Sequence, residues 1–148
     1  MTAAKPLAIA EAAEGDVETV VALWTRCGLT RPWNDPRADI ALARRSPNAA
    51  VLAGRDDDGI VATVMVGHDG HRGWFYYLAV DPQKQGLGHG RAITAAAERW
   101  LAARGIEKVM LMVREDNVAV HAFYRALGYF DQPRTVFAKW LDGRPPTP

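Results

Sequence analysis

Hydrophobic and polar residues alternate along the chain with two different periods, which predicts an α/β fold. A short apolar run, Leu7 to Glu11, is typical of a strand. The apolar residues that follow recur at the period of an amphipathic helix: Val17, Val20, Val21, Trp24 and Cys27. Asp16 stands at the expected N-cap and Gly28 at the C-terminal end of this helix. After a proline-containing loop, a second helix is expected from about Arg37 to Arg45.

The middle of the chain predicts an antiparallel meander. Three β-rich runs follow one another, Asn48 to Arg55, Ile60 to His68 and Trp74 to Val80. The two connections between them each contain an Asp-Gly pair, which is a strong hairpin signal between β-rich runs.

The pattern changes after Val80. A helix is expected from the glycines at 86–90 to about Arg104, then a buried strand at Val109–Val113 and a helix at Val118–Leu127. Two closing strands are expected at Tyr129–Phe130 and Thr135–Trp140. A strand, a helix and a further buried strand form a crossover whose strands run parallel. We therefore expect a mixed, mostly antiparallel sheet of about six to seven strands with helices on both faces.

Composition narrows the class of protein further. The 148 residues suit one domain, with a core at about 7–140 and a flexible tail at 143–148. A net charge of +1 argues against nucleic acid or a membrane surface as a partner, and no apolar run is long enough to span a bilayer. The N-terminus lacks a secretory signal, and the single cysteine excludes an internal disulfide. We expect a cytoplasmic protein without a metal, either a monomer or a homodimer.

The most informative segment runs from Leu78 to Arg91. A strand leads through a proline turn into three glycines at alternate positions, Gly86, Gly88 and Gly90, and then into a helix. Such a loop exposes successive backbone N–H groups at the positive end of the helix dipole, where a diphosphate can bind. Lys84 and Arg91 flank the loop and could add charge-assisted hydrogen bonds.

Two known glycine-loop motifs do not match. A Walker A loop needs Lys-Ser or Lys-Thr after its last glycine, and none follows here. A dinucleotide fingerprint needs a sixth-position glycine, where this chain has Arg91.

The segment Gln85-Gly86-Leu87-Gly88-His89-Gly90 resembles the Gln/Arg-x-x-Gly-x-Gly/Ala signature of the GNAT superfamily of acetyl-CoA-dependent N-acetyltransferases. Leu78 to Pro82 resembles that family's fourth strand and the turn after it. A second block, with Asn117, Tyr124, Gly128 and Tyr129, has the spacing of the family's Asn-x6-Tyr-x3-Gly-Phe/Tyr pattern. The order of elements also resembles this fold over nearly the whole chain.

The resemblance implies transfer of an acetyl group from acetyl-CoA to a primary amine by direct attack in a ternary complex. It implies that the fourth and fifth strands separate and that the pantetheine arm pairs with the main chain of Leu78 and Val80. The pyrophosphate would lie on the residues of the glycine loop: Gln85, Gly86, Leu87, Gly88, His89, Gly90 and Arg91. Asn117 matches the asparagine that binds the pantetheine arm, although it also suits a helix N-cap.

By the same resemblance, Tyr124 is the general acid that protonates the departing thiolate, with simple packing as the alternative. The general base stays open, because Trp74–Val80 contains no carboxylate and Met112 stands where some relatives have a glutamate. Glu115, Asp116 and Asp69 are candidates, as is a water chain ending at Tyr76 or Tyr77.

The loop Trp33-Asn34-Asp35 is expected to form the acceptor side of the cleft, where Asp35 could meet a cationic amine; a proline-stiffened surface loop is the alternative. The segment from Arg31 to Pro36 resembles a little-characterised bacterial branch of the family. Two other classes of function stay open: a non-catalytic acyl-CoA-binding module and a nucleotide- or anion-binding domain.

Overall fold

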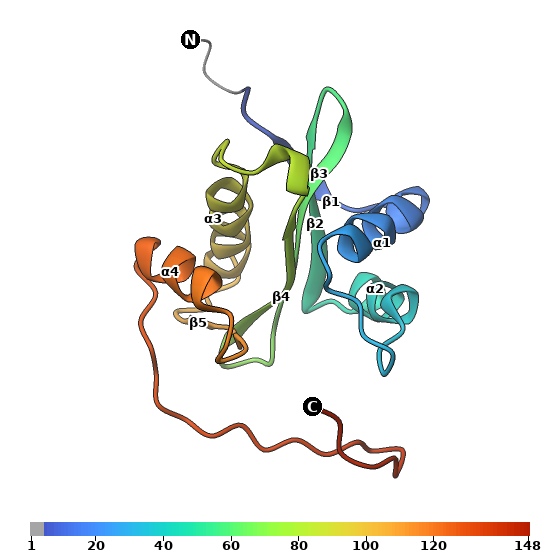
Figure 1. The fold of residues 1–148 in the computed structure, drawn as a ribbon, viewed down its shortest axis with the longest axis vertical. Helices are drawn as coiled ribbons and strands as arrows, with labels where there is room; N and C mark the ends of the chain where they lie inside the picture. The colour runs from blue at the N-terminus through green and yellow to red at the C-terminus, as the bar shows by residue number, and fades with distance from the viewer. Residues whose placement is uncertain (1–4) are drawn as a thin grey trace. The chain divides into compact units, whose positions relative to one another are not determined.

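The computed structural model describes residues 5–148, which divide into two compact units. The first unit ends at Leu111 and contains the whole β-sheet, whereas the second covers Met112–Pro148 and contains one helix, α4 (Val118–Ala126) (Figure 1). No described helix has the length and apolar character needed to cross a membrane.

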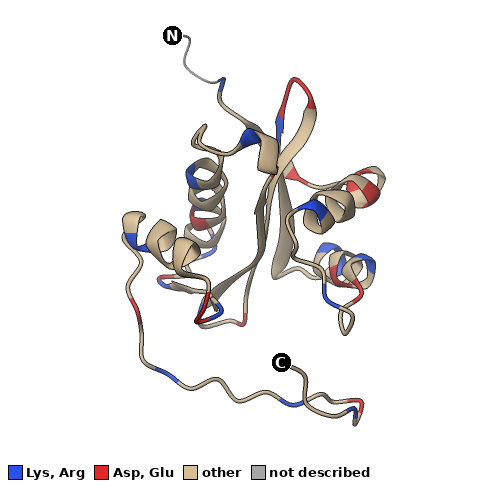
Figure 2. Ribbon diagram, in the orientation of Figure 1, with Lys and Arg blue, Asp and Glu red and all other residues tan. Residues whose placement is uncertain are grey.

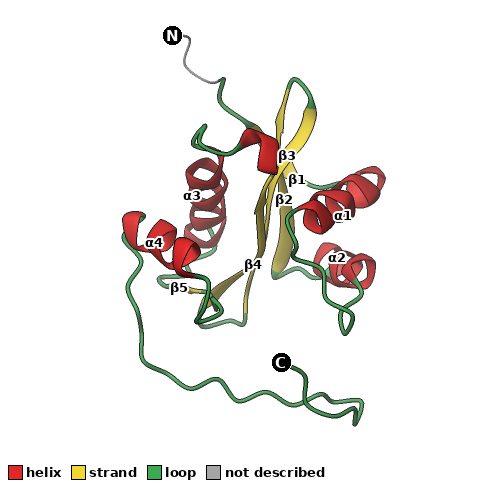
Figure 3. Ribbon diagram, in the orientation of Figure 1, coloured by secondary structure: helices red, strands yellow, loops and turns green. Residues whose placement is uncertain are grey.

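The first unit is built on a five-stranded mixed sheet with strands in chain order. The strands are β1 (Ala8–Glu11), β2 (Ala49–Asp56), β3 (Gly59–His68), β4 (Gly73–Val80) and β5 (Val109–Met110) (Figure 3). Neighbouring strands from β1 to β4 are antiparallel, and β4 pairs with β5 in parallel. The predicted meander and the parallel crossover are therefore both confirmed.

Helices cover both faces of this sheet. Helices α1 (Val17–Arg26) and α2 (Pro36–Arg45) lie on one face, and α3 (His89–Ala102) lies on the other (Figure 1). Two short 3-10 turns, η1 (Glu14–Asp16) and η2 (Pro82–Lys84), precede α1 and follow β4. Asp16 precedes α1 as predicted, but its carboxylate accepts from the Ala13 N–H and pairs with Arg55 instead of capping the helix.

The expected count of six to seven strands is wrong, because residues 5–148 contain five. The strand predicted at Val109–Val113 is only Val109–Met110, and the segments Tyr129–Phe130 and Thr135–Trp140 are irregular. An alternating apolar segment becomes a strand only when a neighbouring edge satisfies its backbone groups. No strand is described beyond Met110, and the side chain of Phe137 is 93% exposed.

Strand β4 is irregular at Tyr77, where its register against β3 shifts between Thr63 and Met65. Tyr77 has a φ of 52°, and it is the only non-glycine residue with a positive φ in the described part of the chain. Its ring stacks on that of Trp24 from α1, with centroids 3.8 Å apart. The buried Thr63 hydroxyl accepts from Trp24 Nε1 (2.8 Å) and donates to the Tyr77 carbonyl (3.2 Å). One buried threonine thus ties α1 and the irregular turn of β4 to β3.

The pairing of β4 with β5 is limited to one end of β4. Only Gly73 and Trp74 have partners on β5, so the rest of β4 has no strand partner on that side within residues 5–148. This geometry agrees with the separation of the fourth and fifth strands that the family resemblance implies.

The Thr63→Val substitution keeps the shape of the side chain and removes its hydroxyl. We expect a loss of about 1–3 kcal/mol in the free energy of unfolding, because the buried Trp24 N–H loses its acceptor. Urea denaturation measures the loss. The control is Thr94→Val, in which the lost hydroxyl only donates to Gly90 of its own helix, so about 0.5 kcal/mol is expected. Equal losses in the two variants would contradict the role given to Thr63.

Candidate functional site

The loop between β4 and α3 presents an open backbone surface. The Asp81 carboxylate accepts from the Gln83 N–H (3.0 Å) and so fixes the start of the turn. Gly86 and Gly88 have φ values of 77° and 84°, which side chains disfavour, and a Cβ at either position would meet nothing within 4 Å. The missing side chains and the open space together leave room for a ligand against the main chain.

Helix α3 begins directly at this loop. The N–H groups of Gly88, His89, Gly90 and Arg91 belong to its first turn and have no hydrogen-bond acceptor in the described part of the chain. Unpaired N–H groups and the positive end of the helix dipole favour an anion such as a diphosphate. Leu87 is half exposed, whereas the His89 side chain is buried, so His89 can offer the ligand its backbone.

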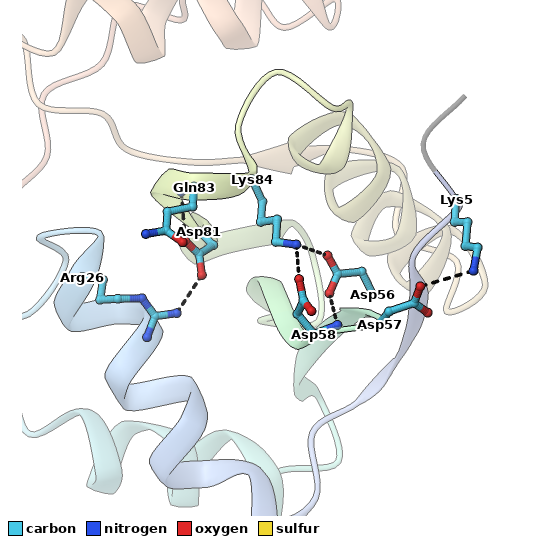
Figure 4. A network of polar contacts seen from close by, with 8 residues as sticks. All are labelled: Lys5, Arg26, Asp56, Asp57, Asp58, Asp81, Gln83 and Lys84. Atoms are coloured by element: carbon cyan, nitrogen blue, oxygen red, sulfur yellow. Dashed lines mark hydrogen bonds and ion pairs between the residues drawn. The ribbon is translucent and has the colours of Figure 1, made fainter. Parts of the chain in front are cut away.

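The two cations that flank the loop differ in their surroundings. Lys84 Nζ pairs with Asp56 (3.0 Å) and Asp58 at the tip of the β2–β3 hairpin, as Figure 4 shows. These carboxylates raise the pKa of Lys84 above its ordinary value. Arg91 is exposed and has no ion pair within residues 5–148. Lys84 therefore fastens the loop to the hairpin, and Arg91 is the cation available to a ligand.

A second ion pair fastens the start of the same turn. Arg26, the last residue of α1, donates to Asp81 at 3.0 Å, which is also drawn in Figure 4. Charges elsewhere in the unit are mixed, with acidic and basic residues together on α1, α2 and α3 (Figure 2). The loop is thus held by specific pairs, without a broad basic surface.

The predicted main-chain positions on β4 are partly occupied. Val80 and Leu78 are half-buried, and the Val80 carbonyl accepts a hydrogen bond from Cys27 Sγ at 3.3 Å. Burial raises the pKa of the Cys27 thiol, and nearby Asp81 adds to the effect, so the thiol stays protonated and serves as a donor. Cys27 therefore acts as a packing residue here.

The predicted acceptor loop leads directly into α2. Trp33 is half-buried and Asn34 is exposed. Asp35 caps the helix, because its Oδ1 accepts from the N–H groups of Arg37 (3.0 Å) and Ala38 (3.2 Å). Its Oδ2 has no hydrogen-bond partner among the described residues, so one oxygen could still meet a cation.

Asn117 and Tyr124 both belong to the second unit. Asn117 precedes α4, but its side chain makes no capping hydrogen bond. Tyr124 is 8% exposed and packs edge-on against Phe123 and Tyr129, with ring centroids 5.0 and 5.3 Å away. Burial raises the pKa of Tyr124 to about 12, so its hydroxyl stays protonated at neutral pH.

The turn with His68, Asp69 and His71 is held by local hydrogen bonds. Asp69 Oδ1 accepts from the N–H groups of His71 and Arg72, and His68 Nδ1 accepts from Gly70. Residues 5–148 contain no group of three or more His, Cys, Asp or Glu side chains arranged to hold a metal ion.

The structure also brings together two residues that sequence spacing did not connect. Tyr77 donates its hydroxyl proton to Asp39 Oδ2 at 2.7 Å, which joins β4 to α2. The residues are 38 positions apart, and Asp39 reads in sequence as an ordinary polar residue on an amphipathic helix. No local signal could have identified this pair.

A mixed sheet with a glycine loop at the start of its crossover helix defines an α/β domain suited to a diphosphate-containing ligand. Comparison with known proteins identifies the family to which this domain belongs. The model of the acetyltransferase (GNAT) family matches residues 17–129. The chain belongs to this family and is an acyltransferase.

Bacterial relatives support the assignment. An acetyltransferase from Yersinia enterocolitica is 42% identical over 128 residues, covering 86% of this chain and 91% of that protein. One from Pectobacterium atrosepticum is 46% identical over 116 residues, covering 78% of this chain and 82% of that protein.

Solved structures of low sequence identity share the fold. The structure of AAC(6')-Iy in complex with the bisubstrate analogue CoA-S-monomethyl-acetylneamine has a TM-score of 0.79 at 16% identity, covering 92% of this chain and 99% of that one. The ribosomal-protein-S18-alanine N-acetyltransferase from Escherichia coli has a TM-score of 0.75 at 23% identity, covering 93% of this chain and 87% of that one.

The two possible roles of Lys84, fastening the loop or binding phosphate, predict opposite changes in CoA affinity when its ion pairs are removed. If Lys84 fastens the loop, the double substitution Asp56→Asn and Asp58→Asn raises the dissociation constant of CoA about two- to fivefold, as Lys84→Met does. If Lys84 binds phosphate, freeing it from the carboxylates strengthens CoA binding. Isothermal titration calorimetry with CoA distinguishes the two outcomes.

The matched control is Asp57→Asn. Asp57 lies on the same hairpin tip but pairs with Lys5, so CoA binding should stay at the wild-type value. Tighter binding in the double variant would contradict the role of Lys84 as a loop fastener.

Proposed function

We propose that the chain transfers the acetyl group of acetyl-CoA to a primary amine by direct attack in a ternary complex. The observation that carries this proposal is the start of α3, where unpaired N–H groups adjoin glycines at which a Cβ would meet only open space. The loop suits the pyrophosphate of CoA, because it offers donors and positive potential without a steric barrier.

The residues of the first unit would bind the co-substrate. The backbone of Gln85 to Arg91 would hold the pyrophosphate, and the exposed Arg91 guanidinium would add a charged contact. The main chain of Leu78 and Val80 would pair with the pantetheine arm along the part of β4 that has no β5 partner. Asn117 in the second unit would contribute an amide to the same arm, since its side chain is not used as a cap.

Acetyl-CoA supplies a thioester carbonyl to the attacking amine. Tyr124 would donate its hydroxyl proton to the sulfur as the carbon–sulfur bond breaks, and the proton released from the amine would restore the phenol. A buried tyrosine suits this task, because its raised pKa keeps the proton available at neutral pH.

The acceptor would approach the loop that precedes α2. Trp33 and Asn34 would form one wall, and the unused Oδ2 of Asp35 would attract a cationic amine. The acceptor would be a protein N-terminus, a lysine side chain or a small molecule. The absence of a carboxylate from β4 favours one competing function, a module that binds acyl-CoA without turning it over.

Release of free thiol from acetyl-CoA in the presence of amines separates the two functions. The amines are spermidine, a lysine-containing peptide with a free N-terminus, and kanamycin. Turnover with any of them supports the enzyme. Tight CoA binding by calorimetry without turnover on any of them supports the module.

The Tyr124→Phe substitution removes one hydroxyl and keeps the packed ring. We expect kcat to fall by at least about 100-fold, with little change in the KM for acetyl-CoA, because a positioned acid acts on the chemical step. Steady-state kinetics measure both constants. Tyr129→Phe is the control. It removes a hydroxyl from the neighbouring ring and should leave kcat near the wild-type value. An unchanged kcat in Tyr124→Phe would remove Tyr124 from the mechanism.

The raised pKa of Tyr124 predicts the alkaline limit of activity. An ordinary tyrosine loses about half of its acid form at pH 10, whereas a group with a pKa of about 12 stays protonated there. We therefore expect kcat to show no loss centred on pH 10 when it is measured from pH 7 to 10.5. A decline with its midpoint near 10, present in wild type and absent from Tyr124→Phe, would contradict the buried phenol.

A further inference from the structure

Tyr77 lies on β4 at the position where the reaction centre is expected. The glycine loop follows Val80, so a pantetheine arm that begins at this loop passes Val80 first and Leu78 next. Its thioester end would then lie near Tyr77, the residue that precedes Leu78 in the strand. The path of the arm along β4 rests on the proposed function.

Tyr77 is also the place where β4 departs from regular geometry. Its φ of 52° is unfavourable for a residue with a Cβ, and such strain persists only where the surroundings enforce it. Trp24 of α1 stacks on the ring and Thr63 of β3 donates to the backbone carbonyl, so two elements hold Tyr77 in place. The strained backbone aims the Tyr77 hydroxyl at α2, where it meets Asp39.

The Tyr77 hydroxyl is itself unsuited to take a proton. Burial and the hydrogen bond to Asp39 raise its pKa far above the ordinary value for tyrosine, and burial also raises the pKa of Tyr76. Both phenols therefore stay neutral at pH 7. Asp39 uses Oδ2 to accept from Tyr77, and its Oδ1 has no hydrogen-bond partner among residues 5–148.

We propose that the Asp39 carboxylate, held beside β4 by Tyr77, binds the ammonium group of the acceptor and takes its proton before the amine attacks. Asp39 thereby supplies the carboxylate that β4 itself lacks. The acceptor is accordingly a primary alkylammonium cation, and Tyr77 is a positioning residue.

The protons balance over one turnover. Asp39 takes one proton from the ammonium and later releases it to solvent. The neutral amine forms the new carbon–nitrogen bond and the carbon–sulfur bond breaks. The thiolate takes the Tyr124 proton, and the second proton lost by the nitrogen restores Tyr124.

The test compares two amines that differ in charge at neutral pH. Butylamine is a cation and must lose a proton, whereas methoxyamine is already neutral. In Asp39→Asn, the side-chain amide can still accept from Tyr77 but cannot take a proton. We expect kcat/KM to fall at least about 100-fold with butylamine and to change little with methoxyamine.

Two further variants separate chemistry from structure. Tyr77→Phe keeps the ring on Trp24 but frees Asp39, so a smaller loss with the same preference for the neutral amine is expected. Asp57→Asn removes a carboxylate on the hairpin tip and should leave both amines unaffected. The dissociation constant of CoA, measured by calorimetry, should be the same in wild type and Asp39→Asn.

The outcomes distinguish this inference from the proposed function. Equal losses with the two amines, or no loss with butylamine, overturn the role of Asp39 while acetyl transfer stands. The role of Asp39 is also overturned, and acetyl transfer still stands, if the wild-type protein acetylates methoxyamine but not butylamine. If wild type binds CoA and turns over neither of these amines nor the three amines named above, both proposals fail together.

Discussion

The buried Thr63 hydroxyl of β3 connects three elements of the first unit through two hydrogen bonds. A buried hydroxyl must satisfy its donor and its acceptor, and here the partners come from two different elements, Trp24 of α1 and Tyr77 of β4. Trp24 is fully buried, so its ring cannot move without losing the buried hydrogen bond to Thr63, and the Tyr77 ring stacks on it. The unusual backbone of Tyr77 is therefore fixed from both sides.

That constraint acts at the strand edge on which the site depends. Beyond Trp74, β4 has no partner on β5 within residues 5–148, and the Val80 carbonyl on this part of the strand accepts a hydrogen bond from Cys27. The next segment, the glycine loop, is held by ion pairs to Arg26 and to the β2–β3 hairpin. A rigid strand and an anchored loop present backbone donors without reorganisation, which favours binding and catalysis.

The net charge of the chain does not reflect the local potential at the glycine loop. The chain carries a net charge of +1, which is unpromising for a protein that binds a polyanionic co-substrate. Backbone N–H groups and one helix dipole supply the positive potential locally, so a basic surface is not needed. The sequence suggests that Lys84 is a phosphate ligand, but its ammonium group forms ion pairs with two carboxylates. Only the position of Asp56 and Asp58 after folding reveals this.

The meander, the crossover and the glycine loop could be predicted from the amino-acid sequence, because each depends on residues close together in the chain. Turn residues, hydrophobic period and the need for positive φ at Gly86 and Gly88 are local properties. Three features became visible only in the folded chain: the shortened fifth strand, the irregular segments after residue 128 and the pairing of Asp39 with Tyr77. A strand needs a partner edge and a hydrogen bond needs a partner atom, and both come from residues far apart in sequence.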